Sequence, residues 1–281
     1  MKDFFAVICR NRRALVGMIL LGIFLLIAIV GPIIVPLETA TNYSQRYQLP
    51  SLKHPFGTDY AGRDTFQQFV HGSRNVITVS FVTAIFTILI AFIVGTTAGI
   101  MGGRVDTIIT FITDIMLTVP SFPVMMVLSL AVTITDPISF GLVLSIWSWA
   151  GLARAIRSQI LSLKQRDFIE ASRVLGLSVP HIIFSELLPN ITSYIAINFI
   201  MIMRNAITAS VGLMVLGLVP FSSTHWGMML QMAVSTSGAM YGSSAIIYLL
   251  VPIIAITLFQ MGCLFFANGL VCVVCNQPSE L

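Results

Sequence analysis

Four polar residues stand in stretches that are otherwise apolar, namely Asp114, Asn198, Arg204 and Asn205. A charged side chain inside a membrane span is costly, and its presence there indicates function by default. The four residues could therefore line a polar path along which a solute crosses a membrane. Arg204 could instead pair with Asp114, or with an acidic group of a partner subunit, and hold helices in register.

The sequence contains no complete set of catalytic or metal-binding residues. Cys272 and Cys275 form a C-x-x-C pair, but neither further zinc ligands nor a βαβ context accompanies it. An H-E-x-x-H motif and a phosphate-binding G-x-x-x-x-G-K-[ST] loop are both lacking. We therefore expect no catalytic residue, no metal ion and no cofactor in this chain, and any ATP that drives it would be hydrolysed by another chain.

The composition indicates an integral membrane protein. Of the 281 residues, 57% are hydrophobic and only 9% are charged, whereas soluble domains average about 25% charged residues. The sequence predicts an all-α fold with six membrane spans, at residues 14–35, 76–101, 107–133, 137–153, 191–218 and 244–271. We divide the chain into an anchor span and loop (1–75), a transmembrane domain (76–271) and an atypical tail (272–281).

Prolines and glycines punctuate these spans. Pro120 and Pro123 interrupt the third span and predict a bend that could line a pore. Gly95 and Gly99 form a G-x-x-x-G pair, which favours close packing of two helices. The first span is too long for a cleaved signal peptide, so we interpret it as an uncleaved anchor.

Positive charges predict the orientation. With the N-terminus inside, the inner segments hold ten Lys and Arg residues and the outer segments hold four. The positive-inside rule therefore favours a cytoplasmic N-terminus and a cytoplasmic C-terminus. It also places the long polar stretch between the fourth and fifth spans in the cytoplasm.

That polar stretch covers residues 166–190. We expect Asp167 to cap a first helix over residues 168–175, and Gly176 to end it in a left-handed conformation. A second helix would start at Ser178, and Pro189 would break the chain before the fifth span. Such a pair of helices could present a knob to a partner protein, or it could be a plain amphipathic loop packed on the spans.

The residues of this stretch resemble the E-A-A-x-x-x-G-x(9)-I-x-L-P signature of ABC importer permeases. Glu170-Ala171-Ser172, Gly176 and Leu188-Pro189 keep its spacing, while Ser172 replaces an Ala and Glu186 replaces an Ile. In that family the segment forms a coupling helix that docks on the ATPase subunit. The resemblance implies that the ATPase contact here is made by Glu170, Ala171, Ser172, Leu175 and Gly176.

A second stretch, HPFGTDYAGRD (residues 54–64), precedes the second span. Read locally, it is a turn followed by a short helix that Asp64 caps and Gly72 ends, a structural re-entry into the bilayer. It also looks like the corresponding segment of the C-type permeases of dipeptide, oligopeptide and nickel importers. Residues 102–106, 162–173 and 226–230 are similar to the same family, whereas the tail after Leu270 departs from it.

The resemblance implies a permease subunit that forms half of a translocation pore in an ATP-driven importer, with peptides as the expected substrate. Nickel, glutathione or oligosaccharide are alternative substrates. Implied partners are a second permease, two ATPase subunits, an extracytoplasmic binding protein and the lipid bilayer of a bacterial or archaeal cell membrane, with no nucleic acid. A stand-alone channel or secondary transporter remains the other hypothesis, although we find no internal repeat of the kind that many secondary transporters contain.

Overall fold

The computed structural model describes residues 11–236 and 245–275, with side chains up to residue 271. Within this part of the chain the regular elements are helices, and the one β interaction is an isolated bridge between Thr58 and Asp64. The side chains of Cys272 and Cys275 lie outside the described residues.

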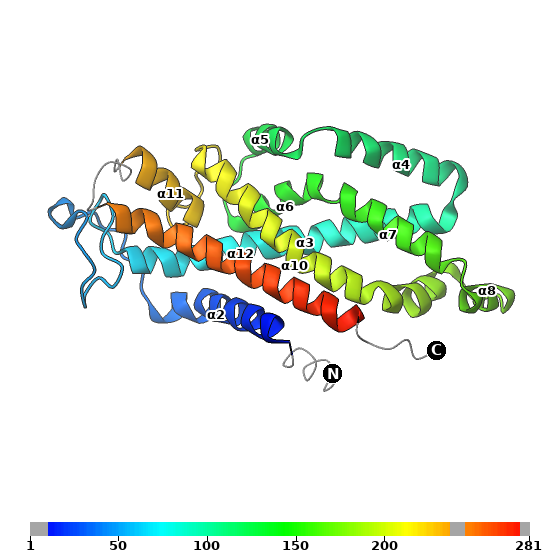
Figure 1. Cartoon of the computed structure of the whole chain (residues 1–281). Helices are drawn as coiled ribbons and strands as arrows, with labels where there is room; N and C mark the ends of the chain where they lie inside the picture. The colour runs from blue at the N-terminus through cyan, green and yellow to red at the C-terminus, as the bar shows by residue number, and fades with distance from the viewer. Residues whose placement is uncertain (1–10, 237–244, 276–281) are drawn as a thin grey trace.

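Long helices lie side by side along one axis, with α3 at the centre (Figure 1). In chain order the elements are α2 (Arg12–Ile34), η1 (Tyr43–Gln45), α3 (Thr65–Met101), α4 (Gly103–Thr118), α5 (Ser121–Ala131), α6 (Pro137–Ser148), α7 (Ala150–Leu163), α8 (Asp167–Val174), α9 (Val179–His181), a π-helical stretch η2 (Ile182–Leu187), α10 (Leu188–Val215), α11 (Trp226–Ser235) and α12 (Ile246–Cys275). α8 lies at one end of the molecule and α11 lies toward the other, and α12 runs from the α11 end toward the α8 end.

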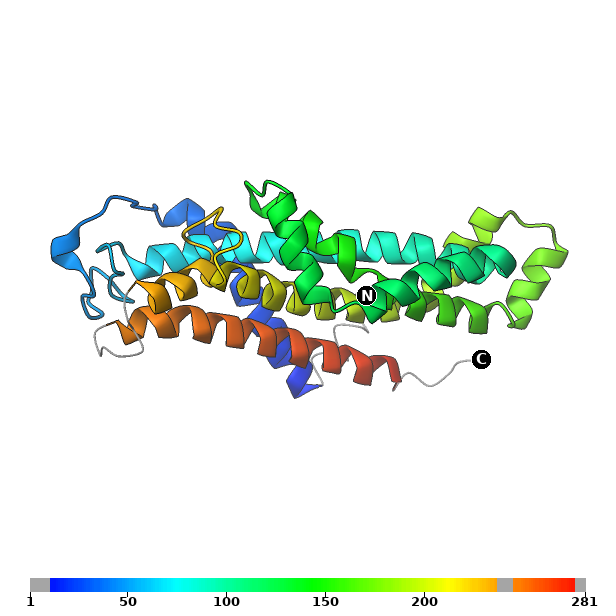
Figure 2. The same ribbon diagram turned by 90° about the horizontal axis from the view of Figure 1, so that it is seen from above.

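The helices agree with six predicted spans. Among the described residues, four helices are long and apolar enough to cross a membrane, and two bent pairs, α4 with α5 and α6 with α7, bring the number to six if each pair is one span. The first pair bends by 91° and the second by 54°. Figure 2 shows α2 crossing the bundle obliquely, and α2 packs chiefly on α12 and α3.

Three local predictions were wrong. Asp167 does not cap α8 but is its first residue, and Arg166 occupies the cap position without a side-chain bond. Gly72 does not end a helix; α3 runs on to Met101, and Gly72 gives room to the carbonyl of Thr224, which would lie 2.1 Å from a Cβ there. Pro189 does not break the chain: the helical stretch runs without interruption from Val179 to Val215, with the π-helical turn of η2 just before the proline.

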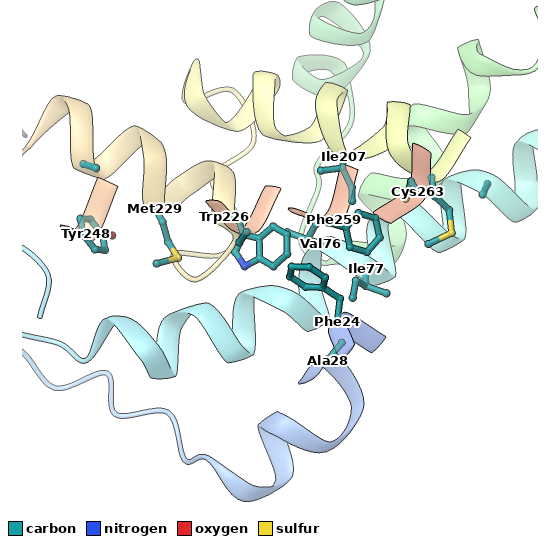
Figure 3. Close-up of a cluster of buried hydrophobic side chains, with 14 of the residues drawn as sticks. Phe24, Ala28, Val76, Ile77, Ile207, Trp226, Met229, Tyr248, Phe259 and Cys263 are labelled. Carbon is teal, nitrogen blue, oxygen red and sulfur yellow. The ribbon is translucent and has the colours of Figure 1, made fainter. Parts of the chain in front are cut away.

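A cluster of buried aromatic and aliphatic side chains at one half of the bundle ties five helices together. Phe24 of α2 makes edge contacts with Trp226 of α11, at 5.7 Å between ring centroids, and with Phe259 of α12, at 5.5 Å. Val76 of α3 and Ile207 of α10 are buried in the same cluster (Figure 3). The first span is therefore an integral part of the packed bundle.

The G-x-x-x-G pair of α3 packs against α7, as predicted. A Cβ on Gly95 would lie 2.5 Å from the carbonyl oxygen of Ala153, and one on Gly99 would lie 2.6 Å from Ile160 Cγ2. Both glycines are buried. The lack of side chains at these two positions lets the backbones of α3 and α7 approach closely.

Candidate translocation cavity and docking helix

The bend between α4 and α5 is set by Pro120. Proline disfavours the helical conformation in the residue before it, and Val119 is extended, with φ −79° and ψ 129°. Pro123 lies in the first turn of α5, where no backbone hydrogen bond is lost. One proline therefore breaks the third span, and the other fits the helix that follows.

A cavity of about 780 Å³ lies at this bend. Its walls come from the bend, the junction of α6 and α7, and the middle parts of α3, α10 and α12. The polar groups that line it are Thr83, Ser121, Ser148, Arg204, Asn205, Thr208 and Gln260. The bend that the two prolines predicted therefore lines a partly polar cavity.

Only two of the four residues predicted to line a translocation path lie at this cavity. Arg204 and Asn205 line the cavity, whereas Asp114 and Asn198 do not. Asn198 donates its amide N–H to the carbonyl of Tyr194 at 2.9 Å. Asp114 forms an ion pair with Arg154, so the alternative pairing of Arg204 with Asp114 is wrong.

Two ion pairs join α4 to α7, and the sequence reasoning did not find them. Arg157 donates to the carboxylate of Asp106 through both Nε and Nη2, a two-pronged geometry that fixes orientation as well as distance. Arg154 donates to Asp114 two turns further along α4. The usable signal was a pair of acids eight residues apart on α4 and a pair of arginines three residues apart on α7.

The segment after α7 holds α8 in a defined position. Ile169 and Ser172 are buried against the bundle, at 1% and 6% exposure. Gly176 follows with φ +72°, and the N–H groups of Gly176 and Leu177 donate to the carbonyls of Arg173 and Ser172. This is the Schellman arrangement that ends a helix at a glycine, as the sequence predicted.

The outer side of α8 is uncovered. Val174 is 85% exposed and Leu175 is 77% exposed, although both are apolar. Glu170 and Ala171 are exposed as well, and Ser172 faces inward. Of the predicted contact residues, four are therefore accessible to a partner, and the fifth fixes the helix to the bundle.

The motif at residues 54–64 is a hydrogen-bonded scaffold. The buried carboxylate of Asp59 accepts from the N–H of Ala61 at 2.8 Å, from Nε of Arg63 at 2.8 Å and from the amide of Gln68 at 2.9 Å. Burial alone would lower the pKa of Arg63, but the ion pair with Asp59 raises it. Asp64 caps α3 through the N–H of Gln67, as predicted.

Two families match the sequence. Residues 91–267 match the binding-protein-dependent transport system inner membrane component, and residues 1–53 match the N-terminal transmembrane domain of oligopeptide transport permease C. The oligopeptide transport system permease protein OppC of Bacillus subtilis is 33% identical over 221 residues, which are 78% of this chain and 72% of the relative. The chain belongs to the family of the binding-protein-dependent transport system inner membrane component, whose members are permeases of ABC importers.

A further relative agrees with this assignment. The dipeptide transport system permease protein DppC of Alkalihalophilus pseudofirmus is 33% identical over 237 residues, which are 82% of this chain and 76% of the relative. The permease is therefore a multi-pass protein of the inner membrane that works with other ABC subunits and is not itself catalytic.

Proposed function

We propose that this permease imports peptides, forming half of a pore whose other half is a second permease. Two separate ATPase subunits drive it, and an extracytoplasmic binding protein supplies the substrate. The peptide substrate is supported by the names of the relatives, which are dipeptide and oligopeptide permeases. The cytoplasmic location of both termini and of α8 is supported by the ten inner against four outer basic residues.

The observation that carries this proposal is the exposed apolar pair on α8. Val174 and Leu175 project from a short helix whose opposite side, Ile169 and Ser172, is fixed to the bundle. Exposed apolar groups on a rigid support are the usual core of a protein interface. Leu175, Glu170 and Ala171 would contact the ATPase subunit, while Gly176 sets the angle of α8.

A continuous path connects this helix to the cavity. α7 leads directly into α8. The ion pairs Arg157–Asp106 and Arg154–Asp114 join α7 to α4, which ends at the Pro120 bend of the cavity. When ATP closes the ATPase pair, the closed pair would bind α8 better in one of its two positions than in the other. This difference in binding would shift the cavity between its inward and outward states.

The half-pore is supported by the exposure of the α4–α7 face. The side chains of Arg154 and Asp114 are 47% and 54% exposed in this chain, within helices that belong to bent spans. Charged groups in spans avoid lipid and face a bundle interior or a water-filled cavity. The second permease and the shared pore would therefore cover this face.

Co-purification of the ATPase subunits with the solubilised permease pair tests the docking role. Glu170→Arg and Leu175→Asp should abolish it, whereas Leu52→Asp, at a fully exposed leucine of the opposite end, should not. Gly176→Val should also lose the ATPases, because Gly176 has a left-handed backbone conformation that valine does not readily adopt. Gly176→Asn should keep them, because asparagine tolerates that conformation and no atom lies within 4 Å of the added Cβ.

Transport by the reconstituted complex tests the rest. ATP-dependent uptake of short peptides should require all subunits. Peptide uptake by this chain alone in ATP-free liposomes would refute the proposal and favour a stand-alone transporter. Uptake of nickel, glutathione or an oligosaccharide in place of peptides would change the substrate assigned to the importer and leave the rest of the proposal intact.

A further inference from the structure

Arg204 lies in the cavity without an acidic partner among the described residues. It stands near the middle of α10, and no ion pair or side-chain hydrogen bond reaches its guanidinium there. The acids that are ion-paired face other cations: Asp114 faces Arg154 and Asp106 faces Arg157. The cavity therefore contains one fixed positive charge and no negative charge of its own.

The polar neighbours of Arg204 do not neutralise it. Gln260 of α12 donates its amide N–H to the hydroxyl of Thr208 at 3.1 Å, and that hydroxyl donates to the backbone carbonyl of Arg204 at 3.3 Å. The first of these bonds links α10 to α12, which pack against each other (Figure 1), and the second lies within α10. They involve the backbone of Arg204 and leave its five N–H donors unused.

Apolar side chains on the other walls of the cavity raise the free energy of an unpaired charge there. Phe122, Leu144 and Trp147 line the cavity beside the polar groups. A guanidinium in such surroundings is strongly stabilised by an anion that it can hold in a two-pronged geometry, and carboxylate fits that geometry. The cavity, at about 780 Å³, is within the usual size range of small-molecule sites.

We infer that Arg204 receives the carboxylate of the transported substrate, so that the pore selects for a free C-terminal carboxylate when the substrate is a peptide. This inference rests on the proposed peptide importer. It assigns a specificity step to the permease in addition to any selection by the binding protein. Asn205, Thr208 and Gln260 supply neutral hydrogen-bonding groups around the same position.

The decisive assay compares trialanine with trialanine amide in proteoliposomes that contain the whole transporter and its binding protein. Because the binding protein is the same in every arm, a change in the acid-to-amide uptake ratio reports on the permease alone. A charge-assisted pair contributes at least about a tenfold preference. Arg204→Gln should reduce the wild-type ratio about tenfold, mainly by slowing uptake of the acid.

Two further variants control this result. Arg204→Lys keeps the charge and should keep most of the preference, with some loss because lysine cannot make the two-pronged contact. Asn205→Ala changes a neutral lining group and should slow both peptides alike. An unchanged ratio in Arg204→Gln, with uptake of both peptides intact, would overturn the inference and leave the importer standing. Failure of the wild-type complex to take up either peptide would instead refute the proposed function.

A chemical measurement on the wild-type complex covers the case in which Arg204→Gln does not assemble. Phenylglyoxal modifies accessible arginines, and mass spectrometry of the α10 peptide reports the modification of Arg204. Trialanine should slow the modification, and trialanine amide should not. Equal protection by both peptides, or resistance to the reagent with no peptide present, would overturn the inference. The latter would indicate that an acid of the second permease neutralises Arg204.

Discussion

Replacing Gly95 by alanine should loosen the packing of α3 on α7. The new Cβ would lie 2.5 Å from the carbonyl oxygen of Ala153 and 3.0 Å from Cβ of Ile156. Because the nearest atom belongs to the backbone, a rotamer change cannot relieve the clash. The two helices must separate by about 0.9 Å to reach an ordinary contact, and such a gap forfeits a quarter to a half of the local dispersion energy.

The expected cost is about 1–2 kcal/mol. Overpacking costs roughly 1–3 kcal/mol, and the better helix propensity of alanine returns about 0.5–1 kcal/mol. For a chain of this size, the midpoint of thermal unfolding should fall by about 3–6 °C. Thermal unfolding of the purified permease in a fixed detergent measures this shift.

Gly22→Ala is the matched control. Gly22 is also a glycine within a membrane-spanning helix, but no heavy atom lies within 4 Å of its added Cβ. This substitution should leave the midpoint unchanged or raise it, because alanine is the better helix former. Equal midpoints for the Gly95 and Gly22 variants would show that the G-x-x-x-G pair does not hold α3 against α7.

Three further predictions concern charged and titratable groups. Asp59→Asn should lower the free energy of unfolding by about 3 kcal/mol, because it removes the buried anion that the partly buried guanidinium of Arg63 faces. Glu38→Gln, at an exposed site, should cost nothing measurable by the same thermal assay. Burial lowers the pKa of His225 to about 3, so the unfolded chain binds a proton that the folded chain excludes. Stability should be constant above about pH 6.5 and fall by up to about 1.4 kcal/mol per pH unit below it. His225→Asn, which keeps an acceptor for the start of α11, should remove that acid-side slope, and an unchanged slope would contradict the assignment. Asp106→Arg and Arg157→Asp should each uncouple ATP hydrolysis from uptake, and the double swap should restore coupling; failure of the swap to restore it would argue against the α4–α7 connection.

Several local features were predictable because they depend on neighbouring residues alone. Gly176 adopts the left-handed conformation expected at the end of α8, and the N–H bonds that follow it are local. Pro120 breaks the third span through its effect on Val119. In contrast, Gly72 reads locally as a helix end, and only the close approach of the distant Thr224 explains why a glycine stands inside α3.

The sequence by itself determined the membrane class and the existence of an exposed segment between the predicted fourth and fifth spans. Hydrophobic length, proline and glycine encode these properties locally. The tertiary structure alone decided which charges meet: Asp114 pairs with Arg154, and Arg204 is left facing a cavity. The physical reason is that an ion pair depends on which faces of two helices come together. That orientation is set by packing such as the contact of Gly95 with Ala153, which joins residues far apart in the chain.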